Sequence, residues 1–168
     1  KDKYFEYDSN IYKDFHFLKD RIFNLNDLKK LSKEVNELER KITLFHAKII
    51  KELSINNEKI LVGFHGQTIY HNAMEKISRQ LGDGKLLYQL TKRRIIYNFR
   101  ENDILNGGEG APLTPIFHKL IASQKKMKLP TCILNIGGIS NVTIVGLDEL
   151  FSKDIGPGNC LIDTWVRK

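Results

Sequence analysis

The chain has 168 residues, 41% of them hydrophobic, and a formal net charge of +7. No apolar run reaches the roughly 18 residues that a membrane span needs, and no signal segment opens the sequence, so we expect a cytoplasmic protein without membrane contacts. The lysines are spread over all predicted helices, and this pattern favours a solvated surface over binding of nucleic acid.

Residues 1–26 combine aromatic and charged side chains without a clear period, and we predict no element there. From Asp27 to Leu53 the apolar side chains recur every three or four residues, which predicts one long helix capped by Asn26 or Asp27. A short coiled coil would show the same spacing. The apolar run 59–64 (KILVGF) that follows predicts a buried strand, and it favours a helix packed on a sheet.

Residues 84–93 predict a short helix, and residues 94–99 (RIIYNF) predict a second strand. A helix between two buried strands is typical of a parallel sheet in an α/β protein. Because two strands alone would form a narrow and poorly covered sheet, we expect further strands before residue 1.

Residues 113–128 predict another long helix, with Pro115 in its first turn. Two short strands, 131–136 and 141–145, are separated by a Gly-Gly turn and predict a hairpin. We expect a change of domain where the lysine-rich helix ends. Residues 1–128 would then form the C-terminal part of a first domain, and 129–168 the start of a second domain that continues further.

Four glycine-rich segments follow predicted strands or loops: FHGQTIYH, DILNGGEGAP, NIGGISN and DIGPGN. Glycine allows backbone N–H groups to approach a phosphate or a sugar hydroxyl, and ligands of open α/β sheets bind beyond the ends of strands. Because each segment also carries His, Asp, Asn or Gln, we predict a cleft for a polar ligand. The motifs of a serine-hydrolase elbow (GxSxG) and of a Walker P-loop are absent from the sequence.

Individual residues of these segments have alternative roles. Asp103 opens the segment DILNGGEGAPLTP, where it could cap a turn or act as a general base. Gln67 and Thr68 are typical of groups that bind hydroxyls. His65 and His71 lack a third ligand at metal-binding spacing, so we expect no metal held by protein side chains.

Five segments occur in an order that identifies a family: GFHGQTIYH, RQLGDG, YNFRENDILNGGEGAPLTPIFH, LNIGGISNV and DIGPGNCLIDTWVRK. Over residues 35–168 the chain resembles the anhydro-N-acetylmuramic acid kinases. The resemblance implies the two-domain α/β fold of the actin- and hexokinase-like sugar kinases, which is related to ribonuclease H. Family members are much longer and open with a phosphate-binding hairpin, GTSxDGxD, that this sequence lacks, so the resemblance implies an internal fragment that is inactive alone.

The resemblance implies an ATP- and Mg²⁺-dependent kinase of peptidoglycan recycling. Water, activated by the aspartate of the DxxxGGxGAPLxP motif, would open the 1,6-anhydro bridge of the sugar, and O6 would take the γ-phosphoryl group to give N-acetylmuramic acid 6-phosphate. Asp103 occupies the position of that aspartate. The full-length protein is expected to be a homodimer. Two alternatives are another sugar or acetate-kinase-like phosphotransferase and a non-enzymatic, actin-like ATP-binding protein.

The resemblance also implies binding residues. The residues expected to bind the sugar are His65, Gln67, Thr68, Gly108, Gly110, Asp154, Gly156, Gly158 and Asn159. The residues expected to bind the phosphates of ATP are Asn135, Gly137, Gly138, Ser140 and Asn141. Two positions depart from the family pattern, because Asn98 replaces the usual aspartate of Asp-Phe-Arg and Glu109 replaces the usual glutamine of GGQGAP.

Overall fold

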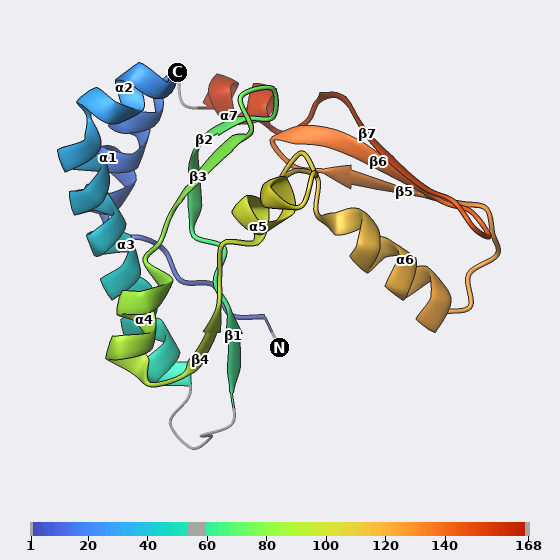
Figure 1. Cartoon of the computed structure of the whole chain (residues 1–168), viewed down its shortest axis with the longest axis horizontal. Coiled ribbons are helices and arrows are strands. Elements are labelled where there is room, and N and C mark those ends of the chain that lie inside the picture. Colours follow the sequence, from blue (N-terminus) through green and yellow to red (C-terminus); the bar gives the residue numbers. More distant parts are fainter. Residues whose placement is uncertain (1, 54–59, 167–168) are drawn as a thin grey trace. The chain divides into compact units, whose positions relative to one another are not determined.

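The computed structural model describes residues 2–53 and 60–166, and the fold is mixed α/β (Figure 1). The chain forms two compact units, Lys1–Gly110 and Ala111–Lys168. The elements of the first unit are α1 (Ser9–Lys19), α2 (Leu25–Lys30), α3 (Ser32–Leu53), β1 (Leu61–Gly63), β2 (Gln67–Asn72), β3 (Ile77–Leu81), α4 (Gly84–Thr91), β4 (Arg94–Ile96) and α5 (Phe99–Leu105). Those of the second unit are α6 (Thr114–Gln124), β5 (Thr131–Ile136), β6 (Ile139–Val145), β7 (Leu150–Pro157) and α7 (Cys160–Val166).

The long helix predicted near the N-terminus is in fact two helices, α2 and α3. α2 begins after Asn24, whose side-chain oxygen accepts hydrogen bonds from the N–H groups of Asn26 and Asp27 at 2.9 and 3.1 Å. Asn24 is therefore the cap, and the prediction of Asn26 or Asp27 is wrong. Leu31 ends α2 at φ −96° and ψ 18°. Because α3 starts at the next residue, the apolar spacing continues across this break and hides it in the sequence.

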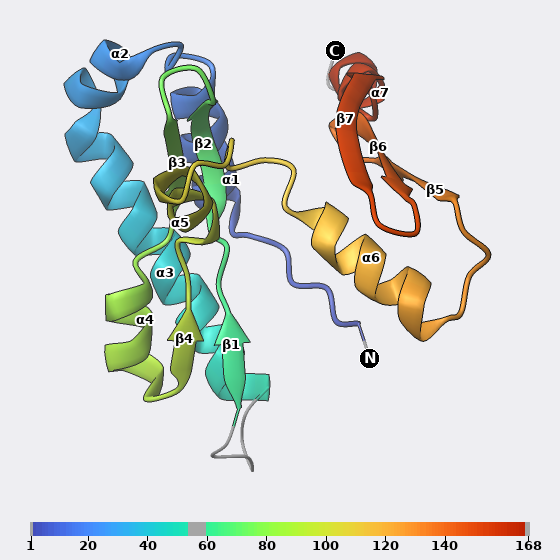
Figure 2. The ribbon, with the colours of Figure 1, turned by 45° about the vertical axis from the view of Figure 1, so that its right-hand side comes forward.

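The main core of the first unit lies where α3 packs on α1 and β3 (Figure 2). α1 occupies the N-terminal region in which no element was predicted, and it buries Ile11 and Leu18, which lie about two helical turns apart. The buried members of this core are Ile11, Leu18, Ile22, Val35, Leu38, Ile42, Ile69, Tyr70 and Leu81. Every helix within the described ranges falls short of the length and apolar character that a membrane crossing requires.

β1 and β4 pair in parallel, with Val62 opposite Ile95, as the order strand, helix, strand predicts. The predicted first strand begins at residue 59, which lies outside the described residues. The second strand ends at Ile96 and not at residue 99. The reason is local, since Asn98 adopts a left-handed φ of 59° and α5 begins directly after it.

The segment FHGQTIYH is a strand from Gln67 onward, where the sequence predicted a glycine-rich loop. This strand, β2, pairs antiparallel with β3, and Gly66 at φ +72° provides the turn that precedes it. The register shifts between Thr68 and Tyr70, so that the adjacent residues Ile69 and Tyr70 are both buried. This bulge breaks the two-residue alternation by which a strand is recognised in a sequence.

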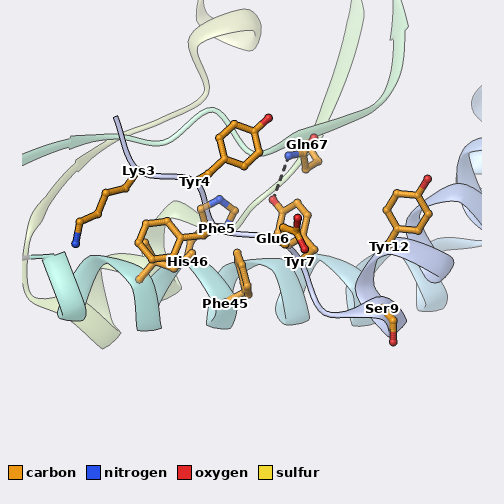
Figure 3. Close-up of a pocket in the computed structure, with 11 residues that line it drawn as sticks. Lys3, Tyr4, Phe5, Glu6, Tyr7, Ser9, Tyr12, Phe45, His46 and Gln67 are labelled. Atoms are coloured by element: carbon orange, nitrogen blue, oxygen red, sulfur yellow. Dashed lines mark hydrogen bonds between the residues drawn. The ribbon is translucent and has the colours of Figure 1, made fainter. Parts of the chain in front are cut away.

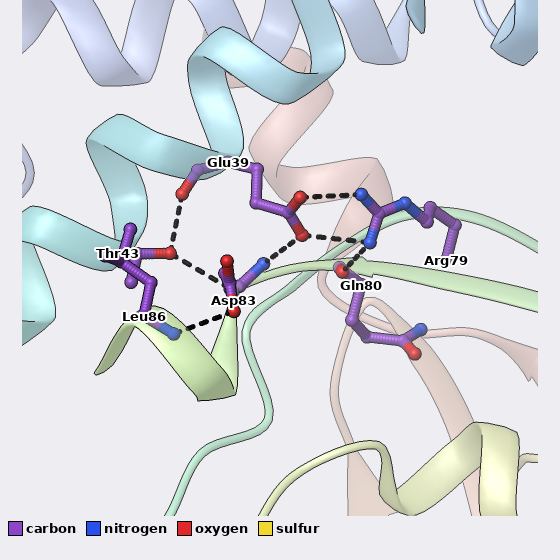
Figure 4. Close-up of polar contacts among 7 residues, drawn as sticks. Glu39, Thr43, Arg79, Gln80, Asp83 and Leu86 are labelled. Carbon is purple, nitrogen blue, oxygen red and sulfur yellow. Dashed lines mark hydrogen bonds and ion pairs between the residues drawn. The ribbon is translucent and has the colours of Figure 1, made fainter. Parts of the chain in front are cut away.

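A polar network joins α3 to the turn between β3 and α4 (Figure 4). The Glu39 carboxylate accepts two hydrogen bonds from the Arg79 guanidinium, at 2.9 and 2.8 Å, and one from the N–H of Gly82 at 3.0 Å. Thr43 donates to the carbonyl of Glu39 at 2.8 Å and accepts from the N–H of Asp83 at 3.0 Å. Asp83 in turn caps α4. These bonds hold the segment RQLGDG on α3.

We expect Glu39→Ala to lower the free energy of unfolding by about 2 kcal/mol, because it leaves a guanidinium and a backbone N–H without their charged acceptor. Urea unfolding measures this change. The matched control is Asp14→Ala, which removes the ion pair of Asp14 with Lys41. Those side chains are 44% and 50% exposed, against 17% and 33% for Glu39 and Arg79, so the control should change stability little. Equal losses in the two variants would contradict the assigned role of Glu39.

The second unit contains an antiparallel sheet in the order β5–β6–β7. The predicted hairpin is confirmed, with Ile133 of β5 opposite Thr143 of β6. β7 was not predicted, because its polar residues and its Gly-Pro step resemble a loop. The predicted domains, 1–128 and 129–168, are those of a longer protein, and that division stays a prediction.

α6 packs on β6 and β7. The ring nitrogen Nδ1 of His118 on this helix lies 2.8 Å from the hydroxyl of the fully buried Thr143. Pro115 lies in the first turn of α6, as predicted. The helix ends at Gln124, earlier than the predicted 128, because Lys126 adopts a left-handed φ of 50°.

Candidate active site

Asp103 lies on helix α5 and not in the glycine-rich loop that follows it. The helix begins after Asn98, whose side-chain amide donates a hydrogen bond to the Glu101 carboxylate in the first turn. An aspartate at position 98 could not donate this bond. Asp103 therefore has a helical backbone that limits where its carboxylate can lie, and its side chain is half-buried.

The loop after α5 folds back onto Asp103. The N–H of Gly108 donates to the Asp103 carbonyl at 2.9 Å, and the N–H of Gly110 donates to its side-chain oxygen Oδ2 at 2.8 Å. The other oxygen, Oδ1, accepts no hydrogen bond from the described residues. Gly107 and Gly110 have left-handed φ angles of 92° and 74°, which favour glycine. A Cβ added to Gly108 would overlap the Asp103 carboxylate itself.

Arg100 joins this loop to the turn that carries His65. Its Nε donates to Nε2 of His65 at 2.8 Å, and its Nη1 donates to the carbonyl of Gly110 at 2.8 Å. Burial lowers the pKa of the Arg100 guanidinium, although arginine stays charged in proteins. Sequence reasoning missed this residue. Its position three residues before Asp103 on a helix was the available signal, because side chains at that spacing share a face.

Gln67 and Thr68 bond to other residues of the first unit. The Gln67 amide donates to the Tyr7 hydroxyl at 3.1 Å, and Thr68 accepts from the side-chain amide of Gln80 at 3.3 Å. Gln67 and Tyr7 line a cavity of about 940 Å³ beside α3, together with His46 and aromatic side chains of the N-terminal segment (Figure 3). Burial raises the pKa of Tyr7 and lowers that of His46, so both are neutral at pH 7.

In the second unit, residues 156–159 (GPGN) form hydrogen bonds with the glycine turn between β5 and β6. The N–H of Gly158 donates to the carbonyl of Gly138 at 2.9 Å, and the N–H of Asn159 donates to that of Gly137 at 2.7 Å. The Asn159 amide also donates to the carbonyl of Ile136 at 3.2 Å. A Cβ on Gly158 would overlap the Gly137 carbonyl, so this close approach requires glycine.

The strand residues next to this turn include an unpaired polar atom. Asn141 lies opposite Asn135 on β5 and Asp154 on β7. Its side-chain oxygen Oδ1 is buried and has no hydrogen-bond partner among the described residues. Ser140, which is 8% exposed and faces Gly156, donates its hydroxyl proton to a β7 carbonyl at 3.3 Å. A buried acceptor of this kind marks a point where a ligand or a water can supply the donor.

The structure thus gathers the candidate residues into two groups, one in each unit. In the first unit, contacts link Asp103, Gly108, Gly110 and His65, whereas Gln67 and Thr68 lie on β2 with other partners. In the second unit, the turn and the strands beside it carry Asn135, Gly137, Gly138, Ser140, Asn141, Asp154, Gly156, Gly158 and Asn159. Their roles in binding and catalysis stay predictions.

Comparison with known proteins gives one consistent result. The family model described as anhydro-N-acetylmuramic acid kinase matches residues 4–168. A protein of that name from Pelagibacter ubique is 59% identical over 173 residues, which cover 99% of this chain and 46% of the relative. A second, from Rhizobium etli, is 40% identical over 151 residues, which cover 85% of this chain and 40% of the relative.

The chain therefore spans less than half the length of each of these relatives. The matched residues include both groups of candidate residues, together with Arg100 of the first unit. From the match over nearly all of its length, we conclude that this chain belongs to the anhydro-N-acetylmuramic acid kinase family.

Proposed function

We propose that this chain is part of an ATP-dependent kinase that opens the 1,6-anhydro bridge of 1,6-anhydro-N-acetylmuramic acid and phosphorylates O6. The proposal rests on the hydrogen bonding of the two Asp103 carboxylate oxygens. One of them is held by the N–H of Gly110, and the other accepts no hydrogen bond from the described residues. A carboxylate oriented in this way and left with one available oxygen suits a general base.

In the proposed reaction, Asp103 takes a proton from water as the water oxygen bonds to the anomeric carbon. The bond between that carbon and the bridging oxygen breaks, and the bridging oxygen becomes O6. O6 then bonds to the γ-phosphorus of ATP, and ADP leaves. Water is a weak nucleophile at neutral pH, so a positioned base contributes about 10²- to 10⁴-fold.

We assign the phosphates of ATP to the glycine turn between β5 and β6. Its residues fit such a group, because a Cβ added to Gly138 would meet no atom within 4 Å, so the backbone there is open to a ligand. The buried Oδ1 of Asn141 requires a donor, which a water bound to Mg²⁺ would supply. Asp154, opposite Asn141, is exposed and remains the proposed contact for a sugar hydroxyl.

The wider assignments follow from family membership. We propose the two-domain, actin- and hexokinase-like fold for the complete protein, a cytoplasmic location, a role in peptidoglycan recycling and a homodimeric state. Membership of the anhydro-N-acetylmuramic acid kinase family favours this kinase over another phosphotransferase or a non-enzymatic ATP-binding protein.

The test uses a chimera, in which this chain replaces the matching segment of the Pelagibacter ubique relative. We expect the chimera to consume ATP only when 1,6-anhydro-N-acetylmuramic acid is present, and in ¹⁸O-labelled water to place the label on the sugar and not on phosphate. The unmodified relative is the positive control. Phosphorylation of N-acetylmuramic acid in preference to its anhydro form would contradict the proposal, because that reaction needs no water.

A further inference from the structure

We infer that Arg100 is a positioning residue, which orients the Asp103 carboxylate through Gly110 and favours the tautomer of His65 that carries its proton on Nδ1. The effect of Arg100 on catalysis rests on the proposed function of Asp103. His65 then contacts Arg100 and takes no part in binding the sugar.

Two hydrogen bonds through Gly110 link Arg100 to the Asp103 carboxylate. Arg100 Nη1 donates to the carbonyl of Gly110, and the N–H of Gly110 donates to Asp103 Oδ2, each at 2.8 Å. Gly110 is buried, and a Cβ there would come within 2.8 Å of the Ile104 side chain, so little room is left for the loop to shift. Within the described residues Arg100 forms no ion pair with Asp103. It therefore acts through the position of Gly110.

The contacts of its two ring nitrogens determine which of them carries the proton in His65. Its Nδ1 lies 2.8 Å from the carbonyl of Gly66, and a carbonyl can only accept, so Nδ1 carries the proton. Its Nε2 lies 2.8 Å from Nε of Arg100, and an arginine N–H can only donate, so Nε2 is bare. Both contacts require the same tautomer. Free histidine prefers the proton on Nε2, so these two contacts together reverse that preference.

The turn that contains His65 packs against the end of β3. Gly66 has a φ of +72°, and an added Cβ would come within 2.5 Å of the Leu81 carbonyl, so the turn sits directly against the end of β3. That end of β3 is tied to α3 by Glu39, through Gly82. These contacts thus connect α3, through the turn at His65, to Arg100 and the loop that follows α5.

Both ring nitrogens of His65 are engaged in this arrangement. A sugar hydroxyl could bond to His65 only by displacing Arg100 or the Gly66 carbonyl. Arginine suits the bridging role because its planar fork offers several donors in fixed directions, which the single ammonium of lysine does not.

The first test reads the tautomer of His65 by ¹H–¹⁵N correlation NMR of the full chain, with its signals assigned from His65→Gln. We expect the proton on Nδ1 at neutral pH, and a shift toward the Nε2 form in Arg100→Met, which keeps the stem and removes every donor. Arg94→Met, at an exposed arginine of β4, should leave the tautomer unchanged. A proton on Nε2 in the unsubstituted chain, or no change in Arg100→Met, overturns the inference. This readout needs no kinase activity, so its failure is distinct from failure of the proposed function.

The second test is a double-mutant cycle in the chimera. Arg100→Met should lower kcat by about 10-fold or more, with little change in KM for ATP, because small misplacements of a catalytic group are costly. In the presence of Asp103→Asn, the same substitution should have almost no further effect. Additive losses would mean that Arg100 acts independently of Asp103. Arg100→Lys should recover only part of kcat, and full recovery would show that charge alone suffices and overturn the bridging role.

Discussion

Asp103→Asn should lower kcat of the chimera by at least about 10²-fold, while the KM values for ATP and for the sugar change little. Asparagine keeps the size of the side chain and an oxygen that can accept from the N–H of Gly110. It loses the ability to take a proton from water. Steady-state kinetics with 1,6-anhydro-N-acetylmuramic acid measures the change.

The matched control is Glu109→Gln, which removes a carboxylate from the exposed side of the same loop. This substitution restores the residue usual in the family, and kcat should stay close to that of the unsubstituted chimera. If Asp103→Asn kept near-normal turnover, the base would have to lie elsewhere, and Asp154 would be the next candidate to test.

Gly108→Ala should also lower kcat, by about 10²-fold, because the new methyl group takes the place of the Asp103 carboxylate. From the sequence alone, a larger residue at this position would only be expected to hinder contact between backbone and ligand. In the structure, the carboxylate must rotate away and give up its hydrogen bond to Gly110. Rapid-quench measurement of the first turnover separates this loss from slower product release.

Gly107→Ala serves as the control for backbone strain in the same loop. Gly107 has a φ of 92°, so alanine there costs about 1 kcal/mol or more of stability, but its Cβ would meet no atom within 4 Å. We therefore expect a lower melting temperature with kcat nearly unchanged. A similar fall of kcat in both variants would point to loop strain as the cause and not to displacement of Asp103.

Several features of this protein could be predicted from local sequence patterns. The parallel pair β1 and β4, the helix α4 between them, and the hairpin of β5 and β6 all follow from short apolar runs separated by glycine or polar residues. Family membership followed from five motifs in order, and the match over residues 4–168 confirms it. Each of these strands and helices depends on residues near one another in the chain and is visible in one short window, whereas the parallel pairing of β1 with β4 followed from the order strand, helix, strand.

Other features were decided only by tertiary structure. The bulge in β2 places Ile69 and Tyr70 in the core together, and only pairing with β3 makes that arrangement stable. The path from Arg100 to His65 joins residues 35 positions apart, and that from Glu39 to Arg79 joins residues 40 positions apart. Periodicity reports which face of an element is buried, but it carries no information about which distant side chain will meet that face. Sequence alone therefore identified Asp103 as a candidate base, whereas the tertiary contacts of its neighbours determine which carboxylate oxygen remains available.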